Sequence, residues 1–336
     1  MAEHKITELM GDGISPELSN SVHTMIDALP VKLEIEQIDL TLENRRKDKK
    51  IYDEALASMA KTEAALKYPT ATETESPNKI IRERCKFSVI HRPCVTIPGV
   101  PTNFKKPIDI DIVRVATGGT YDDAGRRIGL HSAVSVRVIE KEPCRLAARF
   151  AFQLAGKRGR SVISSSKYTI QQATDGLFEE AVSEIARGYS FIKHRRVLFD
   201  ALLAELNMHP EKVQVVVCPN EYGDFLSDAA AGLVGSLGLA DSANYSYKED
   251  GSVAMAMFDP AGGTAPDIAG KDIANPTAAL FALCSMLIFL GEVETGEKLK
   301  AAILECLGEG KSTRDLGGAL GTVAFTQAVV EKFKAK

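Results

Sequence analysis

Apolar residues recur along this chain with two spacings, one typical of strands and the other typical of helices. Residues 5–10 and 31–38 alternate as strands do, and between them a tight turn at 11–14 leads into a helical pattern over 16–29. Strand and helix patterns continue to alternate through the rest of the sequence, which indicates the α/β class. Further strands are expected at 162–165 and 213–218, and further helices at 52–61, 143–157, 175–186, 195–206, 224–233, 277–290 and 296–307.

The length of the chain predicts more than one domain. Its 336 residues exceed the ~250–300 residues at which single hydrophobic cores stop growing, so two domains are expected. Two turn-rich stretches are candidate boundaries, namely the Pro- and Gly-rich connection 94–107 and the stretch 240–244. The charged run 45–50 is expected to be a solvated loop.

Composition argues against several classes of partner. A net charge of −4 disfavours general nucleic-acid binding. The six cysteines include no Cys-x-x-Cys pair, which disfavours a zinc site or a disulfide framework and predicts a reducing compartment, the cytoplasm. The N-terminus lacks an apolar signal core, and the longest apolar segment, 278–290, is shorter than the ~20 residues that span a bilayer. That segment is expected to be a buried helix, without membrane contact.

Two stretches carry the clearest chemical information. The first, 220–228, reads Asn-Glu-Tyr-Gly-Asp-Phe-Leu-Ser-Asp, which places Asp224 and Asp228 four residues apart. On a helix they would project from one face and could hold a hard divalent cation, although such a pair is more often a solvated surface. The second, 259–276, is a loop broken by glycine and proline that could wrap a nucleotide. Together they suggest a metal site and a dinucleotide site.

Both stretches resemble motifs of the β-decarboxylating dehydrogenases, the family of isocitrate and isopropylmalate dehydrogenases. The family's versions run roughly Asn-x-x-Gly-Asp-x-x-Ser-Asp and Glu-Pro-x-His-Gly-Ser-Ala-Pro-Asp-Ile-Ala-Gly-Lys-Gly-Ile-Ala-Asn-Pro, and the resemblance extends from Gly11 to about Gly318. It implies a large nucleotide-binding domain built from both chain ends, expected at 1–98 and 245–336. It also implies an inserted small α/β domain, expected at 99–244, with the metal site and the interface of a homodimer whose subunits share the active site.

Five polar residues between 76 and 114 suit a small substrate with several carboxylates. Arg82, Arg92 and Arg114 could pair with carboxylates, because guanidinium groups bind them bidentately, and Ser76 and Asn78 could add hydrogen bonds. The isocitrate dehydrogenases of the family carry Ser-x-Asn-x-x-x-Arg with this spacing. The resemblance therefore implies that these five residues bind the substrate.

The resemblance also implies an acid–base pair and a metal site. Tyr121, in Thr-Gly-Gly-Thr-Tyr, matches the family's proton-donating tyrosine, and Lys167, in Lys-Tyr-Thr-Ile-Gln, is similar to its Lys-Asn-Thr-Ile-Leu. Asp200 matches a third metal carboxylate that the other subunit contributes, so Mg²⁺ or Mn²⁺ would be held by Asp224, Asp228 and the partner's Asp200. The expected chemistry is oxidation of a malate-type hydroxyl, with Lys167 assisting proton removal, then loss of CO₂ and protonation of carbon by Tyr121.

The choice of cofactor follows from Asp267 and Ile268. An acidic side chain accepts hydrogen bonds from a ribose 2′-hydroxyl but repels a 2′-phosphate, which predicts NAD. The resemblance adds Thr70 and Thr72 on the nicotinamide side and Asn275 at the adenine. The stretch 11–17, Gly-Asp-Gly-Ile-Ser-Pro-Glu, resembles the family's Gly-Asp-Gly-Ile-Gly-Pro-Glu and is equally a structural turn. The remaining cofactor-binding residues expected in the nucleotide loop are Gly263, Thr264 and Ala265.

Polar groups at Ser76 and Asn78 favour a charged or hydrogen-bonding substituent on C3 of the substrate, because an isopropyl group would leave them unpaired. Oxidation of isocitrate to 2-oxoglutarate is therefore expected. The additional cations His91, Arg84 and Lys86 leave room for an analogue such as 3-phosphonomethylmalate.

Two departures from the family's motifs keep a different class of function open. Gly262 replaces the histidine of the nucleotide loop, and Val115 replaces the glutamate that follows the third arginine. A catalytically inactive homologue, with a regulatory or binding role, is the alternative. The presence of every predicted metal and acid–base residue favours an enzyme.

Overall fold

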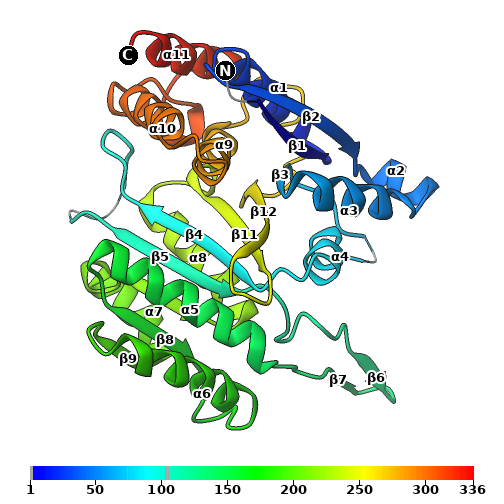
Figure 1. Ribbon diagram of the computed structural model, residues 1–336, viewed down its shortest axis with the longest axis vertical. Coiled ribbons are helices and arrows are strands. Elements are labelled where there is room, and N and C mark those ends of the chain that lie inside the picture. Colours follow the sequence, from blue (N-terminus) through cyan, green and yellow to red (C-terminus); the bar gives the residue numbers. More distant parts are fainter. Residues whose placement is uncertain (1–2, 74, 103, 105) are drawn as a thin grey trace. The chain divides into compact units, whose positions relative to one another are not determined.

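Two compact units make up the chain in the computed structural model, which describes residues 3–73, 75–102, 104 and 106–336 (Figure 1). Unit 1 spans 1–85, 96–104 and 231–336, and unit 2 spans 86–95 and 105–230. Both chain ends belong to unit 1, and unit 2 is inserted between its segments. The bounds differ from those expected: 86–95 belongs to unit 2, whereas 99–104 and 231–244 belong to unit 1.

A mostly parallel sheet forms the centre of unit 1. Strand β1 is parallel to its neighbours β2 and β3, β3 is parallel to β12, and β12 is antiparallel to β11. The carboxyl ends of β1, β3 and β12 therefore lie at one edge of this sheet. The strands, in sheet order, are β2 (Lys32–Asp39), β1 (Glu3–Met10), β3 (Ala64–Lys67), β12 (Val253–Pro260) and β11 (Asp241–Tyr247).

The helices of unit 1 come from both ends of the chain and pack into one core. Leu18 and Met25 from the first helix share this core with Phe258 of β12, Leu283 and Phe325. As expected, the apolar segment near 278–290 forms a buried helix, and no helix among the described residues is long and apolar enough to cross a membrane. The helices are α1 (Ser15–Ile26), α2 (Leu42–Lys47), α3 (Ile51–Thr62), α4 (Pro77–Arg84), α9 (Thr277–Phe289), α10 (Val293–Gly308) and α11 (Thr322–Lys334).

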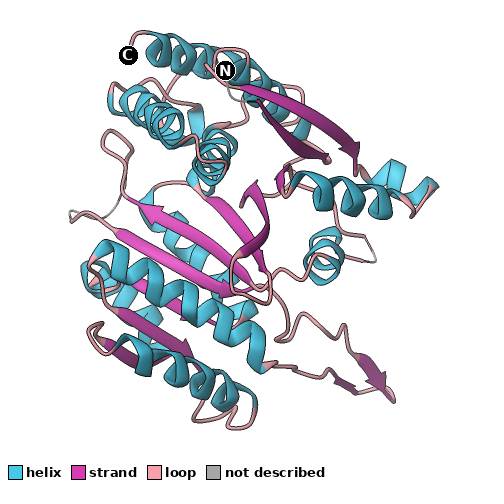
Figure 2. Ribbon diagram, viewed as in Figure 1, coloured by secondary structure: helices cyan, strands magenta, loops and turns pink. Residues whose placement is uncertain are grey.

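In unit 2, β4 is antiparallel to β5, and the remaining neighbouring strands of the sheet are parallel. A separate two-stranded hairpin, β6 (Arg126–Ile128) with β7 (Ser132–Val134), stands away from this sheet (Figure 2). The last turn of α8 passes into unit 1. The sheet order is β4 (Val89–Val95), β5 (Asp109–Val115), β10 (Val215–Cys218), β8 (Val162–Ser166) and β9 (His194–Leu198), and the helices are α5 (Lys141–Arg158), α6 (Thr174–Ala186), α7 (Phe199–Met208) and α8 (Asn220–Val234).

Three local expectations are wrong. The expected helix 195–206 begins as strand β9, and its helical part starts only at Phe199. Within the stretch 240–244, expected to be a turn, residues 241–244 lie in β11 and are buried. The charged run 45–50 includes the end of α2, where Arg45 is buried because it pairs with Asp12 and donates to backbone carbonyls.

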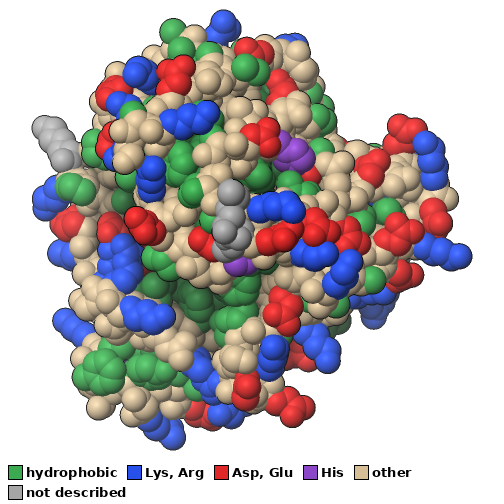
Figure 3. All heavy atoms as spheres, turned by 45° about the horizontal axis from the view of Figure 1, so that its top comes forward, with side chains coloured by type: hydrophobic (Ala, Val, Ile, Leu, Met, Phe, Trp, Pro, Cys, Tyr) green, Lys and Arg blue, Asp and Glu red, His purple; other side chains and the backbone are tan. Residues whose placement is uncertain are grey.

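The outer surface carries both signs of charge. On the face drawn in Figure 3, the Lys and Arg side chains of the described residues are interspersed with Asp and Glu. Many of these charges form exposed ion pairs, such as Lys32 with Glu3 and Lys47 with Glu43. Solvent screens pairs of this kind, so they add little to the free energy of unfolding, and burial of apolar side chains is the main source of stability.

Candidate active site

Two buried arginines project from the same face of the antiparallel pair β4–β5. Ile90 lies opposite Arg114, and Arg92 lies opposite Ile112. Because side chains two residues apart in a strand share a face, Arg92 and Arg114 point to the same side and His91 points to the other. Only 6% of Arg92 and 2% of Arg114 is exposed.

Both arginines and a tyrosine contact the carboxylate of Asp224 in α8. Arg114 Nη1 forms an ion pair with Asp224 Oδ1, and Arg92 Nη1 lies 3.3 Å from the same oxygen. The hydroxyl of Tyr121 donates to Asp224 Oδ2 at 3.0 Å. Asp228, one helical turn further on, has its Oδ1 3.4 Å from Arg92 Nη1. The structure therefore brings five of the predicted site residues of unit 2 together.

The pKa values of two of these groups are raised. Burial disfavours the charged form of Asp228 and raises its pKa, an effect that Arg92 opposes and the charge of Asp224 reinforces. Burial, followed by the charge of Asp224, raises the pKa of Tyr121 to about 12. Tyr121 therefore keeps its proton at neutral pH, as a proton donor must.

The donor set of Asp224 and Asp228 fits a hard cation. Carboxylate oxygens are the ligands that Mg²⁺ and Mn²⁺ prefer. Over the described residues, no group of three or more acidic, His or Cys side chains forms a metal site. The predicted third ligand, Asp200, instead lies 2.5 Å from Lys167 Nζ, and this contact lowers the pKa of Asp200.

Lys167 and Asp200 meet because their strands end side by side. Ser166, the last residue of β8, is in register with Leu198, the last residue of β9, and the two strands are parallel. Lys167 follows the first strand directly, and Asp200 lies in the first turn of α7. The sequence singled out both residues, and the structure brings them together as a pair separate from Asp224 and Asp228.

The three predicted substrate residues of unit 1 lie on or beside α4. Ser76 caps this helix by accepting from Lys79 N at 3.4 Å, so it already has a structural role. Arg82 is buried and its Nε donates to Asn244 Oδ1 at 3.3 Å. Asn78 Oδ1 is a buried acceptor without a hydrogen-bond donor in the part of the chain that the structure describes. An orphaned acceptor of this kind suits a hydroxyl or amide hydrogen of a ligand.

Arg92, in unit 2, also has a buried polar atom without a hydrogen-bond partner among the described residues. Its Nε is a buried donor with no acceptor among residues 3–73, 75–102, 104 and 106–336. A buried guanidinium with an unused N–H suits a further carboxylate oxygen.

Two of the additional cations are used within the fold rather than available to a substrate. His91 Nε2 lies 2.9 Å from Asp111 Oδ1, and its ring packs on Phe150. Arg84 pairs with Asp53 at 2.5 Å. His91 and Arg84 therefore no longer support a phosphonate group on the substrate.

The predicted cofactor loops follow neighbouring parallel strands of unit 1. Thr70 and Thr72 follow β3, and the nucleotide loop between β12 and α9 contains the rest of the predicted set. Ligands of α/β sheets bind outside the carboxyl ends of such strands. The loop presents Asp267 on the surface, and its Asn275 accepts from Thr277 N and donates to Asp315. This exposed carboxylate suits a ribose diol, so the donor set fits NAD. Gly263, Thr264, Ala265 and Ile268 lie in the same loop.

Comparison with known proteins decides the family. A family model described as isocitrate/isopropylmalate dehydrogenase matches residues 5–332. The chain belongs to the isocitrate/isopropylmalate dehydrogenase family. Members of this family are NAD-dependent decarboxylating dehydrogenases.

Individual relatives of this dehydrogenase differ in the substrate that their names give. This chain is 35% identical over 334 residues to a mitochondrial regulatory subunit of the NAD isocitrate dehydrogenase of Dictyostelium discoideum. The match covers 98% of this chain and 91% of the relative. The chain is 36% identical over 330 residues to the 3-isopropylmalate dehydrogenase of Archaeoglobus fulgidus, covering 97% and 98%. The crystal structure of isocitrate dehydrogenase from Methylococcus capsulatus has a TM-score of 0.88 and 30% identity, covering 98% of this chain and 99% of that one.

Several residues of the dehydrogenase's site are not evident from sequence. Gly223 lets α8 approach β5, since a Cβ there would lie 2.6 Å from the side chain of Arg114. Ser227 accepts from Arg92 at 2.7 Å and holds its guanidinium. Lys67, at the end of β3, is buried and donates to Thr70 Oγ1 at 3.3 Å, and burial lowers its pKa to about 8. Only the glycine within the aspartate motif could have indicated a close helix–strand approach.

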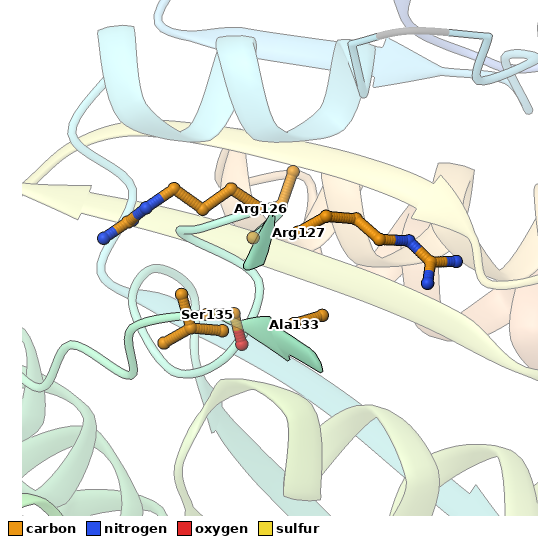
Figure 4. Close-up of a pocket in the computed structure, with 7 residues that line it drawn as sticks. Arg126, Arg127, Ala133 and Ser135 are labelled. Carbon is orange, nitrogen blue, oxygen red and sulfur yellow. The ribbon is translucent and has the colours of Figure 1, made fainter. Parts of the chain in front are cut away.

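A hollow of about 410 Å³ lies against the β6–β7 hairpin and contains none of the predicted site residues. It is lined by residues 124–127 and 133–135, and Arg126 and Arg127 extend in opposite directions (Figure 4). Its two arginines therefore do not converge on a common ligand, and we assign it no catalytic role.

Proposed function

We propose that this chain catalyses the NAD- and divalent-metal-dependent oxidative decarboxylation of a 3-substituted malate, with conversion of isocitrate to 2-oxoglutarate as the leading reaction. One observation carries the proposal. Two buried guanidinium groups, from Arg92 and Arg114, converge with the hydroxyl of Tyr121 on Asp224, beside Asp228. Such a cluster can bind several substrate carboxylates and deliver a proton next to a cation site.

The site residues of unit 2 then have different tasks. Arg92 and Arg114 orient the carboxylates of the substrate. Asp224 and Asp228 are the metal ligands that the chain supplies, and Mg²⁺ or Mn²⁺ at this site would favour ionisation of the substrate hydroxyl. Tyr121 holds a proton at its oxygen for the carbon that loses CO₂.

Lys167 and Asp200 are proposed to act together in the active site of a partner subunit. Both lie in unit 2, and their ion pair keeps them side by side, apart from the aspartate pair of the same chain. A homodimer would bring this pair to the neighbouring site, where Lys167 assists removal of the hydroxyl proton and Asp200 completes the metal ligands. A cytoplasmic location is also proposed, since the six cysteines are free.

The preference for isocitrate rests on Asn78. Its orphaned Oδ1 would stay unpaired beside an isopropyl group, a loss of ~1–3 kcal/mol relative to a substituent with a hydrogen-bonding group. Ser76 and Arg82 remain proposed substrate contacts because of the family's spacing. The phosphonate alternative now rests on Lys86, which is exposed.

The substrate prediction is tested with one panel of hydroxy acids. We measure kcat/KM with Mn²⁺ and NAD for isocitrate, 3-phosphonomethylmalate, homoisocitrate, isopropylmalate, malate and tartrate. Isocitrate is expected to exceed isopropylmalate by about 10- to 100-fold. A higher value for isopropylmalate would overturn the role of Asn78, and a higher value for the phosphonate would assign a specialised substrate. No turnover of any acid, with intact Mn²⁺ binding, would indicate a regulatory role.

Cofactor preference is expected to follow the charge at Asp267. The double substitution Asp267→Lys and Ile268→Tyr should shift the ratio of kcat/KM values towards NADP by about tenfold or more, because it removes a repulsive group and adds attractive ones. The matched control is Asp250→Lys, which makes the same change of charge in the turn between β11 and β12. An unmodified protein that already prefers NADP would contradict the prediction.

A further inference from the structure

The segment 11–17, which runs from the end of β1 into the first turn of α1, contacts both loops that are proposed to hold the cofactor. From sequence alone this segment is equally a simple turn. In the structure its two carboxylates, Asp12 and Glu17, accept hydrogen bonds from backbone N–H groups of residues far along the chain. All of these residues belong to unit 1.

Glu17 holds the nucleotide loop from the first turn of α1. Its Oε2 accepts from Gly270 N at 2.9 Å, and its Oε1 accepts from Asp272 N at 3.0 Å. Both loop residues have positive φ, 74° and 54°, and Asp272 is not a glycine, so this conformation needs support from its surroundings. Each oxygen of one carboxylate thus fixes one positive-φ position of the loop.

The start of the same loop is fixed by the backbone of the segment. Ile14 N donates to Thr264 O at 2.9 Å. Gly13 lies so close that a Cβ would stand 1.9 Å from Thr264 O, and its φ is 61°. The nucleotide loop is therefore anchored at 264 and again at 270–272, on either side of Asp267.

Asp12 performs the corresponding task for the loop after β3. Its Oδ2 accepts from Ala71 N at 2.7 Å, and Arg45, which pairs with Asp12, donates to Ala71 O at 2.7 Å. Ala71 is the residue between Thr70 and Thr72, so both of its backbone polar groups are held. The other oxygen of Asp12 accepts from Leu42 N at 2.8 Å.

We propose that Asp12 and Glu17 are positioning residues of the cofactor site, which fix the nicotinamide-side loop and the nucleotide loop without touching the cofactor. The inference rests on the proposed function. Loops that are ordered before the cofactor binds do not draw on binding free energy for their ordering. If a loop is loosened, the affinity for the cofactor falls in proportion to the fraction of molecules whose loop is in the binding conformation. One short segment thereby couples the order of both loops.

The experiment compares Glu17→Ala and Glu17→Gln with Glu294→Ala. Glu294 is an exposed acidic residue in the first turn of α10 and controls for loss of a negative charge at a helix N-terminus. NADH affinity is measured by fluorescence titration of the full chain, and amide hydrogen exchange is followed in the peptide 266–275. Glu17→Ala is expected to weaken NADH binding about five- to fiftyfold and to speed exchange at Gly270 and Asp272. Glu294→Ala should leave both unchanged.

The conservative variant and the steady-state constants separate positioning from general destabilisation. Glu17→Gln keeps one acceptor oxygen, so its loss of affinity should be smaller than that of Glu17→Ala. KM for NAD should rise more than KM for the hydroxy acid. For the other loop, Asp12→Asn should speed exchange at Ala71 and also raise KM for NAD.

Distinct outcomes overturn distinct claims. Unchanged exchange or unchanged NADH affinity in Glu17→Ala would overturn the inference, as would an equal loss in Glu294→Ala. If the unmodified protein bound neither NADH nor NADPH, the cofactor part of the proposed function would fall and the inference with it. The exchange comparison would then still show whether Glu17 orders the loop.

Discussion

Replacing Asp228 by asparagine is expected to remove Mn²⁺-supported turnover and to leave the protein folded. The substitution keeps the shape of the side chain but removes the charge that a hard cation requires. Its cost to stability is expected to be small, because the Asp228 side chain is 54% exposed and its contact with Arg92 is 3.4 Å long. We expect kcat/KM to fall at least ~100-fold. Calorimetry measures the accompanying loss of Mn²⁺ affinity.

Two further variants sharpen this prediction. Glu180→Gln removes an exposed carboxylate of the same unit and should change neither activity nor Mn²⁺ binding. Asp224→Asn should also inactivate the protein, but it leaves two buried arginines without their shared carboxylate and should lower the melting temperature as well. Unchanged kinetics of Asp228→Asn at saturating Mn²⁺ would remove Asp228 from the metal site.

Two inactive variants, Asp228→Asn and Lys167→Met, are expected to regain activity when their subunits are mixed. If Lys167 acts in the partner's site, a hybrid dimer contains one site with both defects and one site with none. Half of the dimers in an equal mixture are hybrids, so roughly a quarter of the unmodified activity should return. Each variant alone should lose ~100-fold or more, the usual contribution of an acid–base group or a metal ligand.

The matched control mixes Asp228→Asn with Asp224→Asn. Both of these defects belong to the same half of the site, so every hybrid dimer has two damaged sites and no activity should return. Subunit exchange is verified by mass spectrometry of intact dimers that carry one tagged chain. Exchange without regained activity in the Lys167→Met mixture would show that Lys167 does not serve the neighbouring site.

Helices and strands with strong periodicity could be predicted from sequence. Strands that are polar, or that run into a helix without a turn residue, could not. The helix at 277–290 and the strand–turn–helix opening were predicted to within a few residues. Strand β9 was missed because it runs directly into α7 without a turn residue, which leaves one uninterrupted pattern. Strand β11 looked like a turn because it contains Ser242 and Asn244, which are buried only because Asp259 and Met257 O, on the neighbouring strand, accept their hydrogen bonds.

The candidate site was predictable where spacing within one element decides it. Four residues on a helix place Asp224 and Asp228 on one face, and the structure agrees. The direction of His91 was missed because β4 was not recognised; in a strand, the neighbour of Arg92 must point to the opposite face. The burial of Lys67 and the packing of Gly223 depend on segments distant in sequence, which local patterns do not report.

The placement of both chain ends in unit 1 governs the order in which a ribosome can deliver its parts. Strands β1, β2 and β3 and helix α1 emerge early, but Leu18 and Met25 of α1 share their core with Phe325 and Phe333 of α11, which is made much later. Unit 2 takes most of its residues from the continuous stretch 105–230 and is complete before then. The apolar face of α1 therefore stays uncovered by these later helices until the ribosome has made them.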